Sequence, residues 1–144
     1  MTLASTAVAI AGTCAAAVVD ARTGYIPDRI SGAAACAAFA VAAPTGTFVA
    51  AAAGAAAVAG SLLALFAVTR GRGLGFGDVK LGVTIGACCG AGAGMFALGA
   101  AFVSGALFAA LMLASRRKRR QDALPFAPFL AAGTIVAALR AAAP

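Results

Sequence analysis

The feature of this sequence that most limits its fold is the near absence of charge over long apolar segments. Between Val79 and Ala114 the only charged residue is Lys80, at the very start of the segment. A transmembrane helix needs about 17–25 apolar residues, so this segment is long enough for two spans. We expect the break between them near Gly90–Gly94. A soluble helical bundle would instead need a charged face on every helix, which this segment lacks.

The overall composition favours the same fold class. The chain is 63% apolar and 10% charged, whereas soluble domains are about 45–50% apolar and about 25% charged. A soluble protein of this length would lack the polar residues needed to cover its surface. The sequence therefore predicts an all-α integral membrane protein.

The apolar segments predict a bundle of six transmembrane helices in a single domain, residues 1–144. The expected spans are residues 2–19, 27–43 and 48–68, two within 79–114, and 124–139. No Lys or Arg precedes Arg22, so the first segment lacks the positively charged start of a signal peptide. We therefore expect it to be retained as a membrane helix.

The charged residues predict an orientation. The loops after the first, third and fifth spans hold all four Asp residues and every Lys and Arg except Arg140. The positive-inside rule places these loops in the cytoplasm and both termini outside. The net charge of +7 is confined to short loops, above all Arg116–Arg120. This pattern favours contact with anionic lipid over nucleic acid binding. The oligomeric state is left open.

The cysteines do not form a pattern typical of metal binding. The chain has four Cys, none in a CxxC pair, and no His. Because all four lie within apolar segments, we expect them to be small buried hydrophobic residues, and we expect no metal and no cofactor. The four are Cys14, Cys36, Cys88 and Cys89.

Two of the four aspartates, Asp20 and Asp78, lie at predicted helix ends on a face of small residues. Asp78 is followed at four-residue steps by Gly82, Gly86, Gly90 and Gly94, a repeated small-xxx-small stripe that lets helices approach closely. Ala16 and Gly12 precede Asp20 at the same spacing. Both carboxylates are therefore expected to face the bundle interior, where ionisable groups are functional candidates. Asp28 and Asp122 have simpler structural interpretations, as helix-terminal charges.

The residue types available limit the chemistry. Without His there is no obvious base for a serine or cysteine nucleophile, but two carboxylates can share a proton and activate water, as in aspartic proteases. Asp78 begins a predicted helix and Asp20 ends one, so helix dipoles predict an ionised Asp78 and a protonated Asp20. The alternative is a non-enzymatic membrane subunit, such as a proton-coupled transport component that uses the same carboxylates as a relay.

Three short blocks resemble the type IV prepilin peptidases, which are GxGD aspartic proteases of the membrane. The first is Asp20 followed by Ile26-Pro27, and the second is the segment GFGDVKL from Gly75 to Leu81. The third is PFAPFLA from Pro125 to Ala131. Asp28 and Ala127 depart from residues that are common in the family, which are Asn and Gly.

The resemblance implies that Asp20 and Asp78 are catalytic and that the protein cleaves the leader of prepilin-like substrates at the cytoplasmic membrane face. It implies an active-site loop in which Gly75 and Gly77 let the backbone bend and approach a peptide. Pro27 belongs to the first block. Lys80 is expected to steady the loop or a substrate carboxylate, or else simply to reach the interface as a long cationic side chain.

The loop after the first span is too short for the insert with paired CxxC motifs that larger family members carry and that is linked to methylation of the mature pilin. The resemblance therefore implies a peptidase without methyltransferase activity, similar to the short peptidases of tight-adherence (Flp-type) pilus systems.

Overall fold

The fold was analysed in a computed structural model, which describes residues 2–72, 74–115 and 125–143. It contains five helices and, within these ranges, no strand, so the all-α prediction is confirmed. The helices are α1 (Leu3–Thr23), α2 (Asp28–Ala42), α3 (Phe48–Thr69), α4 (Phe76–Ala114) and α5 (Ala127–Ala142). Three of them, α1, α3 and α4, are long and apolar enough to cross a membrane.

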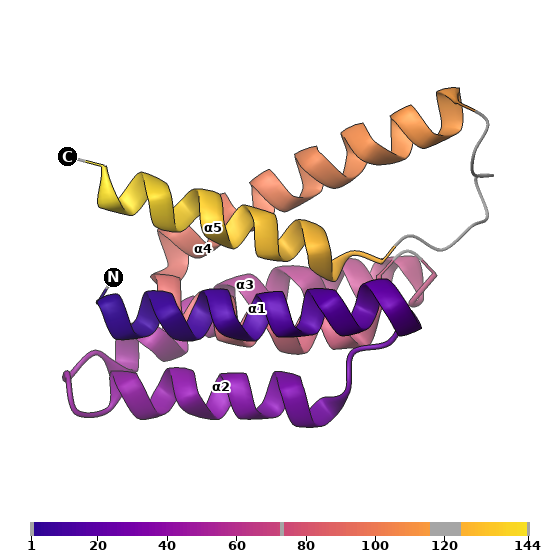
Figure 1. Cartoon of the computed structure of the whole chain (residues 1–144). Helices are drawn as coiled ribbons and strands as arrows, with labels where there is room; N and C mark the ends of the chain where they lie inside the picture. Colours follow the sequence, from indigo (N-terminus) through magenta and orange to yellow (C-terminus); the bar gives the residue numbers. More distant parts are fainter. Residues whose placement is uncertain (1, 73, 116–124, 144) are drawn as a thin grey trace.

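Helix α4 is interrupted at Gly90, whose φ of 75° and ψ of 174° are not helical. Glycine adopts a positive φ without a steric penalty. A Cβ built on Gly94 would lie 3.4 Å from the Cα of Gly86, although eight residues of a continuous helix rise about 12 Å. The chain therefore turns back at Gly90, and Figure 1 shows the two parts of α4 running in opposite directions. The predicted break is confirmed, and it lies inside α4.

The break corrects the prediction of a continuous glycine stripe below Asp78. Gly82 and Gly86 face α3, where a Cβ on Gly82 would meet Leu62 and one on Gly86 would meet Gly54. Gly94 lies on the returning part of α4 and packs against Val58. The stripe therefore ends at the turn, because the four-residue spacing describes one face only as long as the helix is continuous.

Two glycines bring α3 very close to the first part of α4. A Cβ on Gly54 would lie 2.2 Å from the carbonyl oxygen of Gly86, and one on Gly86 would lie 2.1 Å from the carbonyl oxygen of Gly54. These glycines bring the two backbones into direct contact, as small residues do between helices in lipid. The contact fixes the helix that carries Asp78 at its amino-terminal end.

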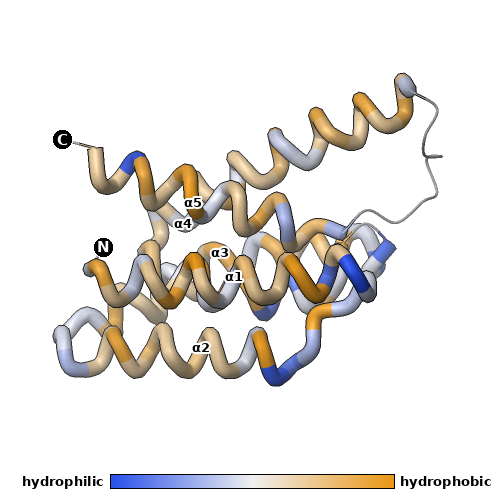
Figure 2. Tube along the Cα trace, in the orientation of Figure 1, coloured by the Kyte–Doolittle hydropathy of each residue, from blue (hydrophilic) through white to orange (hydrophobic). Residues whose placement is uncertain are grey.

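Apolar side chains cover much of the outside, whereas several polar side chains are buried. Large hydrophobic residues are strongly exposed on α1, α3 and α4, among them Leu3, Val49, Val68 and Val103. The buried polar residues are Thr13, Asp20, Ser31, Asp78, Thr84 and Thr134. Hydrophilic positions gather at the end where α1 finishes and α2 and α4 begin (Figure 2). This distribution suits a protein whose sides contact lipid.

The helix bounds differ from the predicted spans at α1, which extends past Asp20 and ends where Gly24 adopts a left-handed conformation. Asp20 thus lies within the last turn instead of after it. Both termini lie at the same end of the molecule (Figure 1). Cys88 and Cys89 are buried as predicted, but that prediction is wrong for Cys36, which is exposed on the outer surface. The predicted start of the last span, Leu124, and the basic run 116–120 lie outside the described residues.

Candidate active site

Asp20 and Asp78 line the same cavity, which has a volume of about 300 Å³. The cavity lies at the end of the molecule where α1 ends and α2 and α4 begin, and residues 58 positions apart (78 − 20) meet there. The lining residues are Asp20, Gly24, Tyr25, Ile26, Asp28, Gly75, Phe76, Gly77, Asp78 and Lys80. The prediction that both carboxylates face the interior therefore agrees with the geometry.

Asp20 is buried between α1 and α5. Its side chain is 7% exposed, and its Oδ2 atom accepts a hydrogen bond from the backbone N–H of Ala127 at 3.1 Å. Ala127 is the first residue of α5, and this contact joins residues 107 positions apart in the chain. The third sequence block thus reaches the site through its backbone.

Asp78 is held by its own loop. It is 5% exposed, and its Oδ2 atom accepts a hydrogen bond from the backbone N–H of Gly75 at 3.2 Å. Gly75 is the N-cap residue of α4, so the carboxylate binds the end of the helix it belongs to. The other oxygen, Oδ1, is buried and has no hydrogen-bond partner among the described residues. A buried carboxylate oxygen without a partner is costly and is a natural position for a ligand or water.

The helix termini do not distinguish the two carboxylates as predicted. Asp78 lies at the amino-terminal end of α4, as expected. Asp20 lies in the last turn of α1, but it also binds the amino-terminal end of α5. Since a helix amino terminus attracts an anion, both side chains occupy such a position. Because Asp20 also lies at the start of α5, the helix termini alone assign no protonation state to either carboxylate.

The predicted active-site loop lies beside both carboxylates. Gly75, Gly77 and Lys80 line the cavity, whereas Pro27 is the N-cap residue of α2 and is not among the lining residues. A Cβ on Gly77 would lie 2.9 Å from the Cβ of Ile26. Only glycine therefore lets the start of α4 pack this closely on the α1–α2 connection, which is the packing of the second sequence block against the first.

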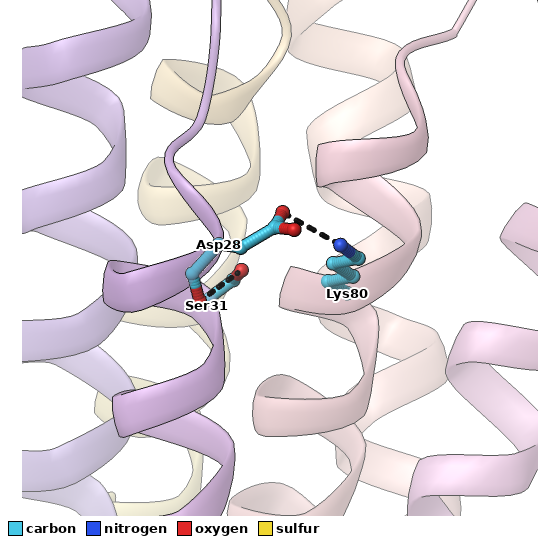
Figure 3. A network of polar contacts seen from close by, with 3 residues as sticks. All are labelled: Asp28, Ser31 and Lys80. Atoms are coloured by element: carbon cyan, nitrogen blue, oxygen red, sulfur yellow. Dashed lines mark hydrogen bonds and ion pairs between the residues drawn. The ribbon is translucent and has the colours of Figure 1, made fainter.

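Lys80 forms an ion pair that the sequence analysis missed. Its Nζ atom lies 2.6 Å from Asp28 Oδ1 and joins the start of α2 to the start of α4 (Figure 3). The Lys80 side chain is 35% exposed and that of Asp28 is 67% exposed, so the pair contributes about 0–1 kcal/mol. Lys80 also lies above the Phe76 ring, 5.2 Å from its centroid. In the sequence, the only indication of this ion pair was that Asp28 and Lys80 each lie near a predicted helix start.

No three Cys, Asp or Glu side chains are grouped as metal ligands in the part of the chain that the structure describes. The described residues that line the cavity supply carboxylates, the ammonium group of Lys80 and backbone amides.

A family model described as the type IV leader peptidase family matches residues 7–110. The chain belongs to this family. It is accordingly a prepilin leader peptidase, a hydrolase of the membrane that acts in pilus assembly, and the family resemblance is confirmed. The matched range of this leader peptidase includes Asp20 and Asp78 and ends before the block at residues 125–131. No match was found among curated proteins or solved structures.

Proposed function

We propose that this leader peptidase is an aspartic endopeptidase that cleaves Flp-type prepilins at the cytoplasmic membrane face and activates water with Asp20 and Asp78. The observation that carries the proposal is that the two buried carboxylates, from different helices, line one small cavity. Nothing else in that cavity is a comparable acid or base: Asp28 is largely exposed and already paired with Lys80. The short α1–α2 connection, from Gly24 to Pro27, supports the assignment to the short Flp-type form.

The chemistry follows from two buried carboxylates in one site. Like charges placed close together favour a state in which the pair holds one proton. The ionised carboxylate takes a proton from water, whose oxygen attacks the carbonyl carbon of the scissile peptide, while the protonated carboxyl donates its proton to the carbonyl oxygen. The resulting tetrahedral intermediate collapses as its C–N bond breaks. The amine leaving group takes the proton that the first carboxylate removed from water, and a hydroxyl of the intermediate returns a proton to the second carboxylate. Asp78 Oδ1, buried and without a partner among the described residues, is the oxygen available to the water.

The loop residues are proposed to receive the substrate backbone. Gly75, Gly77 and Lys80 line the cavity, and Pro27 is the N-cap residue of α2, between the lining residues Ile26 and Asp28. Gly77→Ala is expected to lower kcat by about 10- to 100-fold, because displacing a reacting group by even 1 Å can cost that much. Steady-state kinetics on a prepilin peptide measure this effect, and an unchanged kcat argues against the loop assignment.

The membrane arrangement is proposed to comprise six spans, with α4 contributing two. The turn at Gly90 and the position of both termini at one end (Figure 1) support an even number of crossings. The positive-inside rule then puts the cavity at the cytoplasmic side and the termini outside. The basic run 116–120, outside the described residues, is proposed to contact anionic lipid. An alkaline phosphatase fused after residue 144 should be active, and an inactive fusion would contradict this orientation.

Co-expression with a Flp-type prepilin tests the function. We expect the precursor to be shortened by one cut just before its hydrophobic segment, visible on a gel and located by mass spectrometry. The new amino terminus is expected to carry no methyl group, since the four residues between α1 and α2 leave no space for a methyltransferase insert. An uncut precursor in cells that express the peptidase would overturn the proposal, and a methylated product would overturn the second part.

A further inference from the structure

We propose that the amino-terminal turn of α5 is a third structural component of the active site, in which the backbone N–H of Ala127 positions the Asp20 carboxylate. This inference rests on the proposed function for its catalytic meaning. Its structural basis is the 3.1 Å hydrogen bond from Ala127 N to Asp20 Oδ2, which is buried. Ala127 is a positioning residue, because it acts on Asp20 and not on the substrate.

The donors of the first turn of α5 explain why this contact forms. Pro128, the second residue of the helix, has no N–H group. The amides of Phe129 and Leu130 both donate to the carbonyl oxygen of Phe126. The N-cap residue, Phe126, provides no side-chain hydrogen bond. The Ala127 N–H is therefore the one amide of this turn that needs an acceptor from elsewhere, and Asp20 of α1 supplies it.

The contact also limits the orientation of Asp20. The Ala127 hydrogen bond is the one hydrogen bond to its carboxylate among the described residues. With Oδ2 tied to α5, the second oxygen remains for the cavity that Asp20 shares with Asp78. Asp78 is held in the same manner, since the Gly75 N–H takes its Oδ2. Each carboxylate thus has one oxygen bound to a backbone amide at a helix start, and the pair is held for reaction by three helices.

The packing around Ala127 supports a fixed geometry. Ala127 has no exposed surface, and the neighbouring buried positions on the same face of α5 are Leu130 and Ala131. Phe126 and Phe129 pack against Phe102 and Phe108 of the returning part of α4, with ring centroids 5.0 and 5.6 Å apart. The start of α5 is therefore held in place both by these aromatic contacts and by the hydrogen bond to Asp20.

Nuclear magnetic resonance of the full chain in detergent micelles tests the hydrogen bond without any substrate. Labelling Phe with ¹³C at the carbonyl and Ala with ¹⁵N isolates the five Phe-Ala pairs of the sequence, at residues 39–40, 66–67, 96–97, 108–109 and 126–127. We expect the Ala127 amide proton to resonate downfield, as the donor of this hydrogen bond, and to move upfield in Asp20→Ala, which removes the acceptor. The cross-peak absent from Ala127→Pro identifies the residue.

The other charged groups that line the cavity provide controls. These are Asp78, Asp28 and Lys80. In Asp28→Asn the Ala127 amide proton should keep its shift, because Asp28 is bound to Lys80 and not to Ala127. An Ala127 amide shift that is the same in Asp20→Ala as in the unmodified protein would overturn the proposed contact.

Activity gives the second arm. Ala127→Pro removes the N–H at a helix position where proline is favoured, although its ring also restrains the αR backbone of Phe126. It is expected to lower kcat by about 10- to 100-fold with little change in KM. Ala127→Gly retains the N–H and should restore most of kcat. A wild-type kcat in a folded Ala127→Pro protein would overturn the positioning role. If the unmodified protein cuts no prepilin, the proposed function fails, while the Ala127 amide shift in Asp20→Ala still decides the contact.

Discussion

Replacing either Asp20 or Asp78 by Asn is expected to reduce prepilin cleavage by at least about 10²–10⁴-fold, the range typical of a lost general acid or base. Asn has nearly the same shape but cannot take or give a proton at this position. The double variant should be no less active than either single variant, because residues that act as a unit have non-additive effects. Cleavage of a co-expressed prepilin, followed over time on a gel, measures the loss.

Asn is the informative substitution at Asp20 because of the contact with α5. An Asn side chain still offers an oxygen to the Ala127 N–H, whereas Asp20→Ala removes that acceptor. Losing an N-cap acceptor costs about 0.5–2 kcal/mol. Thermal unfolding should therefore rank Asp20→Ala below Asp20→Asn in stability, while both are inactive.

Asp28→Asn is the matched control for the catalytic pair. It removes a third carboxylate from the lining of the same cavity, but one that is 67% exposed and paired with Lys80. Most of the cleavage activity should remain. Full cleavage by Asp20→Asn or Asp78→Asn would eliminate the two-carboxylate mechanism. An equal loss of cleavage activity in all three variants would show that activity depends on the total negative charge of the cavity and not on the catalytic pair.

Gly86→Ala is expected to destabilise the protein by about 1–3 kcal/mol or more, the cost typical of overpacking. A Cβ at this position would lie 2.1 Å from the carbonyl oxygen of Gly54 and 2.7 Å from the backbone N of Ala55. Both obstacles are backbone atoms, so no side chain can rotate away, and α3 and α4 must separate. Unfolding in mixed micelles with increasing SDS would report the change.

Two glycines in the same helices serve as controls. Gly60 in α3 and Gly99 in α4 have open space where a Cβ would be placed. Gly60→Ala and Gly99→Ala should leave stability unchanged or raise it slightly, since alanine is the better helix former by about 0.5–1 kcal/mol. If Gly86→Ala unfolds at the same SDS concentration as these controls, the direct backbone contact between α3 and α4 does not stabilise this part of the fold.

Several features were accessible from the sequence because they depend on local pattern. The scarcity of charge requires helices in lipid, since an unpaired backbone group is too costly there. The apolar segment after Asp78 was too long for one span, and its break was predicted near Gly90, where φ is positive. The sequence analysis also selected Asp20 and Asp78 together, because both end a face of small residues next to a predicted loop.

Other features were not accessible because they join segments that are distant in the chain. The glycine stripe after Asp78 could not reveal that the chain turns back and places Gly94 beside Gly86. The Lys80–Asp28 pair needed the packing of α2 against α4. The third block had a family resemblance but no physical role until Ala127 was found to donate to Asp20.

The sequence by itself determined that this protein is helical, apolar on its outside and supplied with two interior carboxylates, because hydropathy and helix periodicity are properties of neighbouring residues. Only the tertiary structure decided what holds those carboxylates. Asp20 lies in the last turn of α1, yet it also binds the start of α5, so the amino terminus of α5 acts on it as well as the carboxyl terminus of its own helix. A helix dipole acts on whatever lies at its end, and which residue lies there depends on packing that no local pattern encodes.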